Sequence, residues 1–316
     1  MNTLLSARPT TAATGRGGVA RSPRRWGRSA GLPRGGRPDR AVRPSAPRLT
    51  PAQALGLVAL LAFALFPAYW MVSTALDPHA ATRGGSLLPR AISTEHFAYV
   101  VTDAGFGRYL LNSALVAIVT VTVSSLVALL AAVAVARFAF PLRRQILVAI
   151  LVAQMVPLEA LVIPLFLQAR TLGMLNSLLG LAIVYLAFSL PFAVWQLRGF
   201  VAAVPVEVEE AAYIDGCGWW QMFRHVLFPL VAPGLVATSV FSFITAWNEF
   251  IFALTFLQSD RRYTVAIGLQ KFFGEHSADW GPIMAASTLI TVPVVVFFLL
   301  VQRNLVSGLS AGAVKG

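Results

Sequence analysis

Six long apolar stretches constrain this chain more than any other feature of its sequence. A helix that crosses about 30 Å of hydrocarbon needs about 20 mainly apolar residues. Stretches of this kind run over residues 55–76, 110–136, 146–167, 178–197, 226–257 and 282–301. Only 12% of the residues are charged, against about 25% in an ordinary soluble domain. The sequence therefore predicts an all-α polytopic membrane protein with six transmembrane helices in a domain over residues 51–316.

Prolines interrupt several of these stretches. Pro157 and Pro164 lie in the third, Pro191 in the fourth, and Pro229 and Pro233 near the start of the fifth. Proline removes a backbone donor and kinks a helix, which a membrane tolerates where a neighbour or a cavity satisfies the backbone. We expect kinked spans, and a fifth stretch whose first part lies on the membrane surface or enters the membrane bent.

The N-terminal 50 residues differ in composition from the rest. They hold eleven arginines against a single acid, Asp39, and are rich in Pro, Gly and Ser. This composition is typical of a disordered cytoplasmic tail, with lipid or nucleic-acid contact and an organelle transit peptide as the alternatives. Because Trp26 is the only aromatic residue there, we expect membrane lipid and not nucleic acid among the partners.

The placement of basic residues predicts the orientation. The tail, the turn with Arg137, Arg143 and Arg144, and the end with Arg303 and Lys315 fall on one side if the chain crosses six times. The opposite connections, residues 77–108 and 258–281, carry balanced charge. Since arginine-rich short loops face the cytoplasm, both termini are expected in the cytoplasm and the protein in the cell membrane.

The connection between the fourth and fifth stretches is patterned like a helix. Pro205 suits a helix start, Glu207, Glu209 and Glu210 follow it, and Gly216 ends or bends the helix. A face with helical spacing is formed by Val208, Ala211, Ala212 and Asp215. The two alanines make this face shallow. It either docks against a partner or is a short interfacial link between two spans.

This segment resembles a known family. Glu210, Ala211, Ala212 and Gly216, followed after nine residues by Val226, Phe228 and Pro229, are similar to the EAA loop of permeases in binding-protein-dependent ATP-binding cassette (ABC) importers. Val226 and Phe228 replace the family's Ile and Leu. Further similarity to the carbohydrate-uptake, maltose-type branch lies at residues 163–165, 172–173, 247–254 and 308–316.

The resemblance implies a permease subunit and no enzyme activity. Such importers combine two permeases, here expected to be different chains, with two ATPase subunits and an extracytoplasmic solute-binding protein. ATP and Mg would lie on the ATPase, since this chain has no phosphate-binding Gly-rich motif. The expected contacts with the ATPase are Glu210, Ala211, Ala212, Asp215 and Gly216.

Polar residues inside the apolar stretches are the candidates for a substrate path. An ionisable group at membrane depth costs about 2.5–3.5 kcal/mol or more on insertion scales, which makes Glu159 and Glu249 notable. Gln154 and Asn248 add amides, and Trp247 adds an aromatic face, as a sugar path requires. Either these groups line the path, or they join helices and subunits.

The external segment over residues 258–281 is expected to contact the binding protein through Lys271, Phe272 and Phe273. A solvated loop is the alternative.

A metal site or a cofactor bound by this chain is not expected, because Cys217 is the only cysteine and the four histidines are scattered.

Two other functions compete with the importer permease. A secondary transporter would couple ions through carboxylates such as Glu159 and Glu249, but usually has two related halves, which the sequence does not show. A membrane-embedded enzyme would need a convergent catalytic set, and its common motifs are absent from the sequence.

Overall fold

The computed structural model describes residues 50–82, 84, 86–274 and 279–312. The predicted basic tail lies outside the described residues, apart from Thr50. All elements assigned within the described ranges are helices, which confirms the predicted all-α class.

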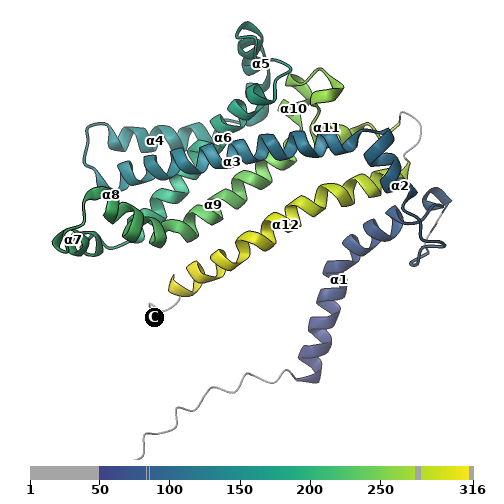
Figure 1. The fold of residues 1–316 in the computed structure, drawn as a ribbon, viewed down its shortest axis with the longest axis horizontal. Coiled ribbons are helices and arrows are strands. Elements are labelled where there is room, and N and C mark those ends of the chain that lie inside the picture. Colours follow the sequence, from purple (N-terminus) through teal and green to yellow (C-terminus); the bar gives the residue numbers. More distant parts are fainter. Residues whose placement is uncertain (1–49, 83, 85, 275–278, 313–316) are drawn as a thin grey trace, which may run out of the picture. The chain divides into compact units, whose positions relative to one another are not determined.

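The helices follow one another along the chain as labelled in Figure 1. The first six are α1 (Pro51–Ala75), α2 (Glu95–Ala98), α3 (Phe106–Arg137), α4 (Arg143–Gln154), α5 (Val162–Thr171) and α6 (Leu178–Ala203). The others are α7 (Val206–Ile214), α8 (Trp219–Met222), α9 (Phe228–Asn248), α10 (Ile251–Phe256), α11 (Val265–Gln270) and α12 (Trp280–Gly312). Short 3₁₀ turns span Ala80–Thr82, Leu158–Leu161 and Asp260–Arg262, and π-helical turns span Tyr99–Asp103 and Phe223–Leu227.

Five helical stretches of the described chain are long and apolar enough to cross a membrane. They are α1, α3, α6, Trp219–Asn248 and Trp280–Gln302. A sixth crossing results if α4 and the bent segment after it, Leu158–Thr171, are counted as one span. The predicted number of spans therefore holds only if one of them is broken.

The third apolar stretch, predicted over residues 146–167, is not one continuous helix, and it bends next to Pro157, one of the two prolines expected to kink it. α4 ends at Gln154, and the helical segment that resumes at Leu158 is bent from it by 93°. Pro157 has an extended backbone, with φ −61° and ψ 127°. Proline disfavours a helical conformation in the residue before it, so the helix ends upstream of Pro157 and restarts after it.

The fifth stretch breaks at a different place from the one predicted. Pro229 and Pro233 do not interrupt it, since the chain stays helical from Trp219 to Asn248. Pro229 lies in the first turn of α9, directly after the π-helical turn Phe223–Leu227, and there a missing N–H costs little. The break comes instead at Glu249 and Phe250, before the short α10.

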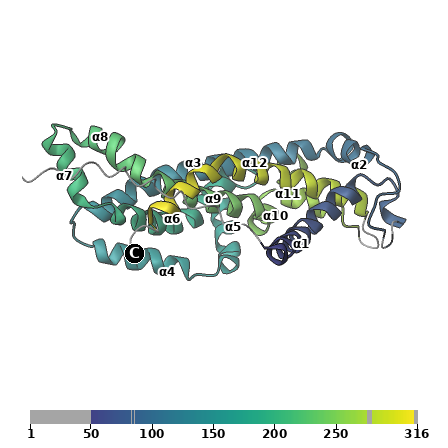
Figure 2. The same cartoon turned by 90° about the horizontal axis from the view of Figure 1, so that it is seen from below.

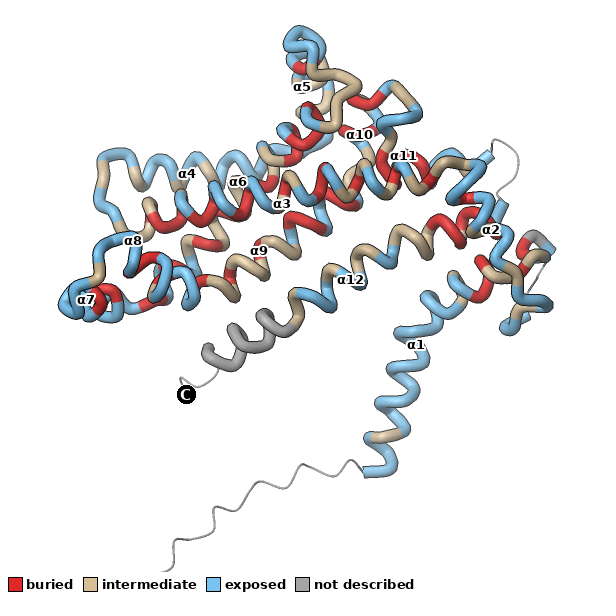
Figure 3. Tube along the Cα trace, viewed as in Figure 1, coloured by how far each residue is buried: buried red, intermediate tan, exposed pale blue. Residues whose placement is uncertain are grey.

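The outward surface of the long helices is apolar, as a bilayer requires. The most apolar part of α1 has no buried residue, and Leu55 and Phe63 are 72% and 82% exposed. Figure 3 shows this exposure along α1, whereas α3, α6 and α9 each bury one side. Side chains of this kind are stable in hydrocarbon and unfavourable in water.

Two clusters of buried side chains hold α3, α6 and α9 together, and these three helices pack on one another. The larger cluster contains Phe106, Tyr185, Trp247, Phe252 and Phe256 and lies toward α10 and α11. The smaller one contains Ala132, Leu197, Val201, Ala212, Met222 and Leu227 and includes one residue of α7. Figure 2 shows α7 and α8 at one end of α3, and α2 and α11 near the other.

The close approach of α6 and α9 depends on Gly234. A Cβ atom at this position would lie 2.2 Å from Cγ of Phe200. Gly234→Ala should therefore destabilise the protein by about 1–3 kcal/mol through overpacking. The melting temperature of the purified protein in lipid nanodiscs measures this loss.

Gly199→Ala is the matched control, because nothing lies within 4 Å of a Cβ atom built at Gly199. In the interior of a helix, alanine should be neutral or stabilising there by about 0.5–1 kcal/mol. Equal melting temperatures for the two variants would contradict this packing.

Candidate functional site

One carboxylate holds the break between α9 and α10. Glu249 has an extended backbone, with φ −68° and ψ 129°. Its Oε1 accepts the backbone N–H of Phe252 at 2.7 Å, and its Oε2 accepts the N–H of Ala253 at 3.0 Å. Oε2 also accepts the hydroxyl of Tyr185 in α6 at 2.6 Å. Glu249 thus satisfies donors at the start of α10 and ties the break to α6.

An open pocket of about 360 Å³ lies beside this break. Its polar wall contains Glu159, Asn248 and Glu249, together with Thr245. The apolar wall is formed by Leu158, Phe250, Ile251 and Phe252. Carboxylate, amide and hydroxyl groups together can donate and accept hydrogen bonds to a ligand rich in hydroxyls.

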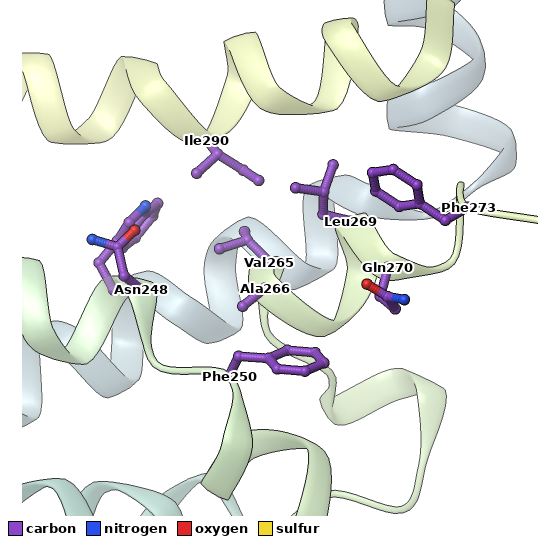
Figure 4. Close-up of a pocket in the computed structure, with 9 residues that line it drawn as sticks. Asn248, Phe250, Val265, Ala266, Leu269, Gln270, Phe273 and Ile290 are labelled. Carbon is purple, nitrogen blue, oxygen red and sulfur yellow. The ribbon is translucent and has the colours of Figure 1, made fainter. Parts of the chain in front are cut away.

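A second pocket of about 290 Å³ adjoins the first, because Asn248 and Phe250 line both. Figure 4 shows Ile290 of α12 above, Phe250 below, and the α11 side chains between them. Its wall combines three aromatic rings with two amides: Trp247, Phe250, Phe273, Asn248 and Gln270. Aromatic faces next to amides suit a ligand that has both C–H and O–H surfaces.

The structure brings four of the five predicted path residues to these pockets and leaves one apart. Trp247 lines the second pocket but is only 2% exposed, and its ring stacks on Phe243 with centroids 5.4 Å apart. Gln154 lies exposed at the end of α4, where its amide bonds the carbonyl of Ile150 at 3.4 Å. Gln154 lines neither pocket because α4 ends before the 93° bend that carries Glu159 to the first one.

The predicted docking segment forms a helix that begins after Pro205 and ends before Gly216, as expected. α7 starts at Val206 and ends at Ile214. Gly216 has φ +86° and donates its N–H to Tyr213 O at 3.0 Å, and Cys217 donates to Ala212 O, also at 3.0 Å. This pair of bonds is a Schellman motif, which ends a helix at a left-handed residue.

The exposed face of α7 differs from the predicted one at a single alanine. Glu210, Ala211 and Asp215 are exposed, as docking requires. Ala212 is only 6% exposed and packs in the smaller buried cluster. Glu209, three residues earlier, is buried as well, so these two residues form the inner face of the helix. The prediction that Ala212 shares the outer face is therefore wrong.

Sequence reasoning missed two of the residues that organise the site. Arg137, the last residue of α3, forms a buried ion pair with Glu209 across 2.6 Å. Tyr185 is a phenol inside an apolar stretch, and that isolated polar group was the only sign of its bond to Glu249. Each pair joins residues far apart in the sequence, so only the fold reveals it.

Lys271 is engaged within the chain. Its ammonium group donates to the carboxylate of Asp260 and to the hydroxyl of Tyr109, the latter at 3.1 Å. The Tyr109 hydroxyl in turn donates to Asp260 at 2.7 Å. The hydrogen bond from Lys271 holds the pKa of Asp260 below its usual value, and the bond to Asp260 raises the pKa of Lys271.

The two neighbouring phenylalanines differ in exposure. Phe272 is half-buried, and its ring packs on Phe106 with centroids 5.9 Å apart. Phe273 is 44% exposed and lies at the second pocket. Of the three residues predicted to reach outward, Lys271 and Phe273 are exposed and Phe272 is half-buried.

Apolar spanning helices around a polar pocket, with an exposed helix at one end, are typical of a membrane permease. Residues 124–311 match the family described as "Binding-protein-dependent transport system inner membrane component". The chain belongs to this family of ABC importer permeases, whose members are multi-pass proteins of the inner membrane. Membership implies association with a partner permease, an ATPase and a binding protein.

Curated relatives cover most of the chain. It is 42% identical over 254 residues to the diacetylchitobiose uptake system permease protein DasC of Streptomyces coelicolor, covering 80% of this chain and 92% of that protein. It is 35% identical over 259 residues to the trehalose transport system permease protein SugB of Mycobacterium tuberculosis, covering 81% and 94%.

A solved structure supports the fold. A bacterial ABC transporter involved in import of the acidic polysaccharide alginate contains a chain that matches with a TM-score of 0.66. The match covers 80% of this chain and 94% of that one at 22% identity. At this identity the likeness shows the fold alone.

The pair of Lys271 and Asp260 predicts how the outer segment responds to acid. Because the folded pKa of Asp260 is lowered, its stabilising contribution is present above pH 3.8 and is lost as the pH falls through the folded pKa. We therefore expect amide exchange over residues 265–270, corrected for intrinsic rates, to accelerate as the pH falls through the folded pKa of Asp260. Asp260→Asn should accelerate it at neutral pH and remove the acid dependence.

Glu95→Gln provides the control, since Glu95 is an exposed acid of α2. Its exchange profile over residues 265–270 should match that of the unmodified protein. An unchanged profile for Asp260→Asn would show that this ion pair does not order the segment.

Proposed function

We propose that this permease carries a carbohydrate across the cell membrane, after an extracytoplasmic binding protein delivers it. The observation that carries the proposal is the 42% identity, over four-fifths of the chain, to a permease named for uptake of diacetylchitobiose. The aromatic and amide groups around the two pockets support it, because sugars present both hydroxyls and apolar faces.

The chain works as one half of the membrane path. Both pockets open onto its surface, so an enclosed path requires a second permease, which we propose to be a different chain. Two ATPase subunits complete the complex on the cytoplasmic side and hold the ATP and Mg. The arginine-rich turn after α3 supports a cytoplasmic location for that end of the bundle and for both termini.

Asn248 is the central residue of the proposed path, since it lines both pockets. Glu159 and Trp247 each line one of them. Glu249 contributes to the wall, but three donors already engage its carboxylate, so its main effect is to fix the break that presents Asn248. Gln154 would join the path only through a rearrangement of the segment after α4.

The outer segment is proposed to contact the binding protein. Phe273 offers an exposed ring, Lys271 an exposed ammonium group held by Tyr109 and Asp260, and the half-buried Phe272 supports the surface from within. Asn112 steadies the same segment, since its amide donates to the carbonyls of Arg261 and Tyr263 at 3.0 and 2.9 Å.

α7 is proposed to be the coupling helix that seats in the ATPase. Its exposed residues Glu210 and Asp215 can pair with basic groups, and Ala211 permits close approach. Ala212 supports the helix from the inner side, and Gly216 sets the turn that ends it. ATP hydrolysis can drive transport only if the states of ATPase and permease are energetically linked.

Uptake into proteoliposomes tests the proposed function. The complex that co-purifies with this chain is reconstituted with its binding protein outside, ATP inside, and labelled diacetylchitobiose, trehalose or maltose as probes. We expect uptake of at least one probe that requires ATP and is unaffected by a protonophore. ATP-independent uptake that collapses with the protonophore would instead indicate a secondary transporter.

Gly216→Val tests the coupling turn. A β-branched residue at φ +86° is strained by about 1–3 kcal/mol. The variant should insert in the membrane normally and lose both uptake and binding-protein-stimulated ATP hydrolysis. Gly218→Val is the matched control, because Gly218 has an extended backbone that valine adopts easily. If Gly216→Val transports as well as Gly218→Val, the segment is only a linker.

A further inference from the structure

A single guanidinium group joins three helices at the end of the bundle that carries α7. Nε of Arg137 donates to Oε1 of Glu209 in α7 at 2.6 Å. Nη2 donates to the backbone carbonyls of Val201 and Val204 at the end of α6, both at 2.8 Å. The Arg137 and Glu209 side chains are only 12% and 7% exposed.

The geometry suits arginine and no other residue. Its planar fork presents several donors in fixed directions, so one side chain can bond a carboxylate and two carbonyls at once. A cation is also favoured at the C-terminal end of α6, where the helix dipole is negative and where Val204 is the capping residue. The guanidinium group of Arg137 therefore holds both the end of α6 and the start of α7.

Few other contacts tie α7 to the bundle. Glu209 and Ala212 are its only buried residues. Ala212 packs in the smaller cluster with Leu197 and Leu227, and such an apolar contact lets surfaces slide. The ion pair has a defined length and direction, so it resists displacement of α7 along its own axis.

α3 connects this end of the bundle to the opposite one. It is a helix of 32 residues, which corresponds to about 48 Å. Its first turns hold the outer segment: Ser113 accepts the N–H of Val265 at 2.9 Å, and Tyr109 donates to Asp260. Its last residue, Arg137, holds α7.

We infer that Arg137 is a positioning residue that makes α7, the end of α6 and α3 move as one unit. A displacement of α7 is then passed along α3 to the segment that faces the binding protein. That the ATPase displaces α7 rests on the proposed function. That Arg137 links the three helices does not depend on it. Restraint of α7 and coupling of ATP hydrolysis to uptake therefore need separate measurements.

Amide exchange of α7 in the nanodisc-embedded complex tests the link alone. In Arg137→Met, exchange over residues 206–214 should accelerate at least about tenfold, which corresponds to about 1.4 kcal/mol. Arg137→Lys should give a smaller effect, because one ammonium replaces the fork. Arg144→Met is the control, since it removes an exposed arginine from the same turn and should change nothing. Equal exchange in Arg137→Met and Arg144→Met would overturn the inference.

The number of sugar molecules imported per ATP hydrolysed tests the consequence. The informative variant combines Arg137→Met with Glu209→Leu, since an apolar pair removes both buried charges and leaves the fold stable. We expect normal assembly with a ratio lowered at least about tenfold. If this double variant had a normal ratio of sugar imported to ATP hydrolysed and normal amide exchange in α7, the ion pair would have no role in coupling. If the unmodified complex neither imports sugar nor responds to the binding protein, the proposed function fails, and amide exchange still decides whether Arg137 restrains α7.

Discussion

Hydrocarbon offers no hydrogen-bonding partner, so every break in a spanning helix needs its own donors and acceptors. The break between α9 and α10 depends on Glu249, whose two oxygens take two backbone N–H groups and the hydroxyl of Tyr185. Because this bond reaches α6, the break is fixed relative to the bundle. Asn248 and Phe250, the residues on either side of Glu249 at this break, line both pockets.

The ion pair of Arg137 and Glu209 has a different purpose. Glu249 holds a wall of the proposed path in place, whereas the pair of Arg137 and Glu209 holds the helix proposed to receive force from the ATPase. α3 runs between these regions and packs along both α6 and α9. A permease needs both kinds of contact, because the wall of the path must keep its shape while the helices of the bundle move as rigid pieces.

Apolar length and family spacing were enough to predict the class and a helix that begins after Pro205, and the six predicted crossings result if α4 and Leu158–Thr171 count as one span. They did not predict where helices break. Proline identified the bend near Pro157, but near Pro229 it gave a wrong position, because a π-helical turn precedes it and the first turn of a helix tolerates proline. The partners of Glu209 and Glu249 lie 72 and 64 residues away, and single-sequence patterns carry no record of such pairing.

Accessibility of the pocket in different nucleotide states tests most directly that this chain lines an alternating path. Thr245 lines the first pocket and is exposed, so Thr245→Cys in a Cys217→Ser background places one thiol there. A membrane-impermeant maleimide is applied from either side of the reconstituted complex, without nucleotide and with a non-hydrolysable ATP analogue. We expect the side from which the thiol is labelled to change with nucleotide. Labelling from the same side at the same rate in both states would contradict it.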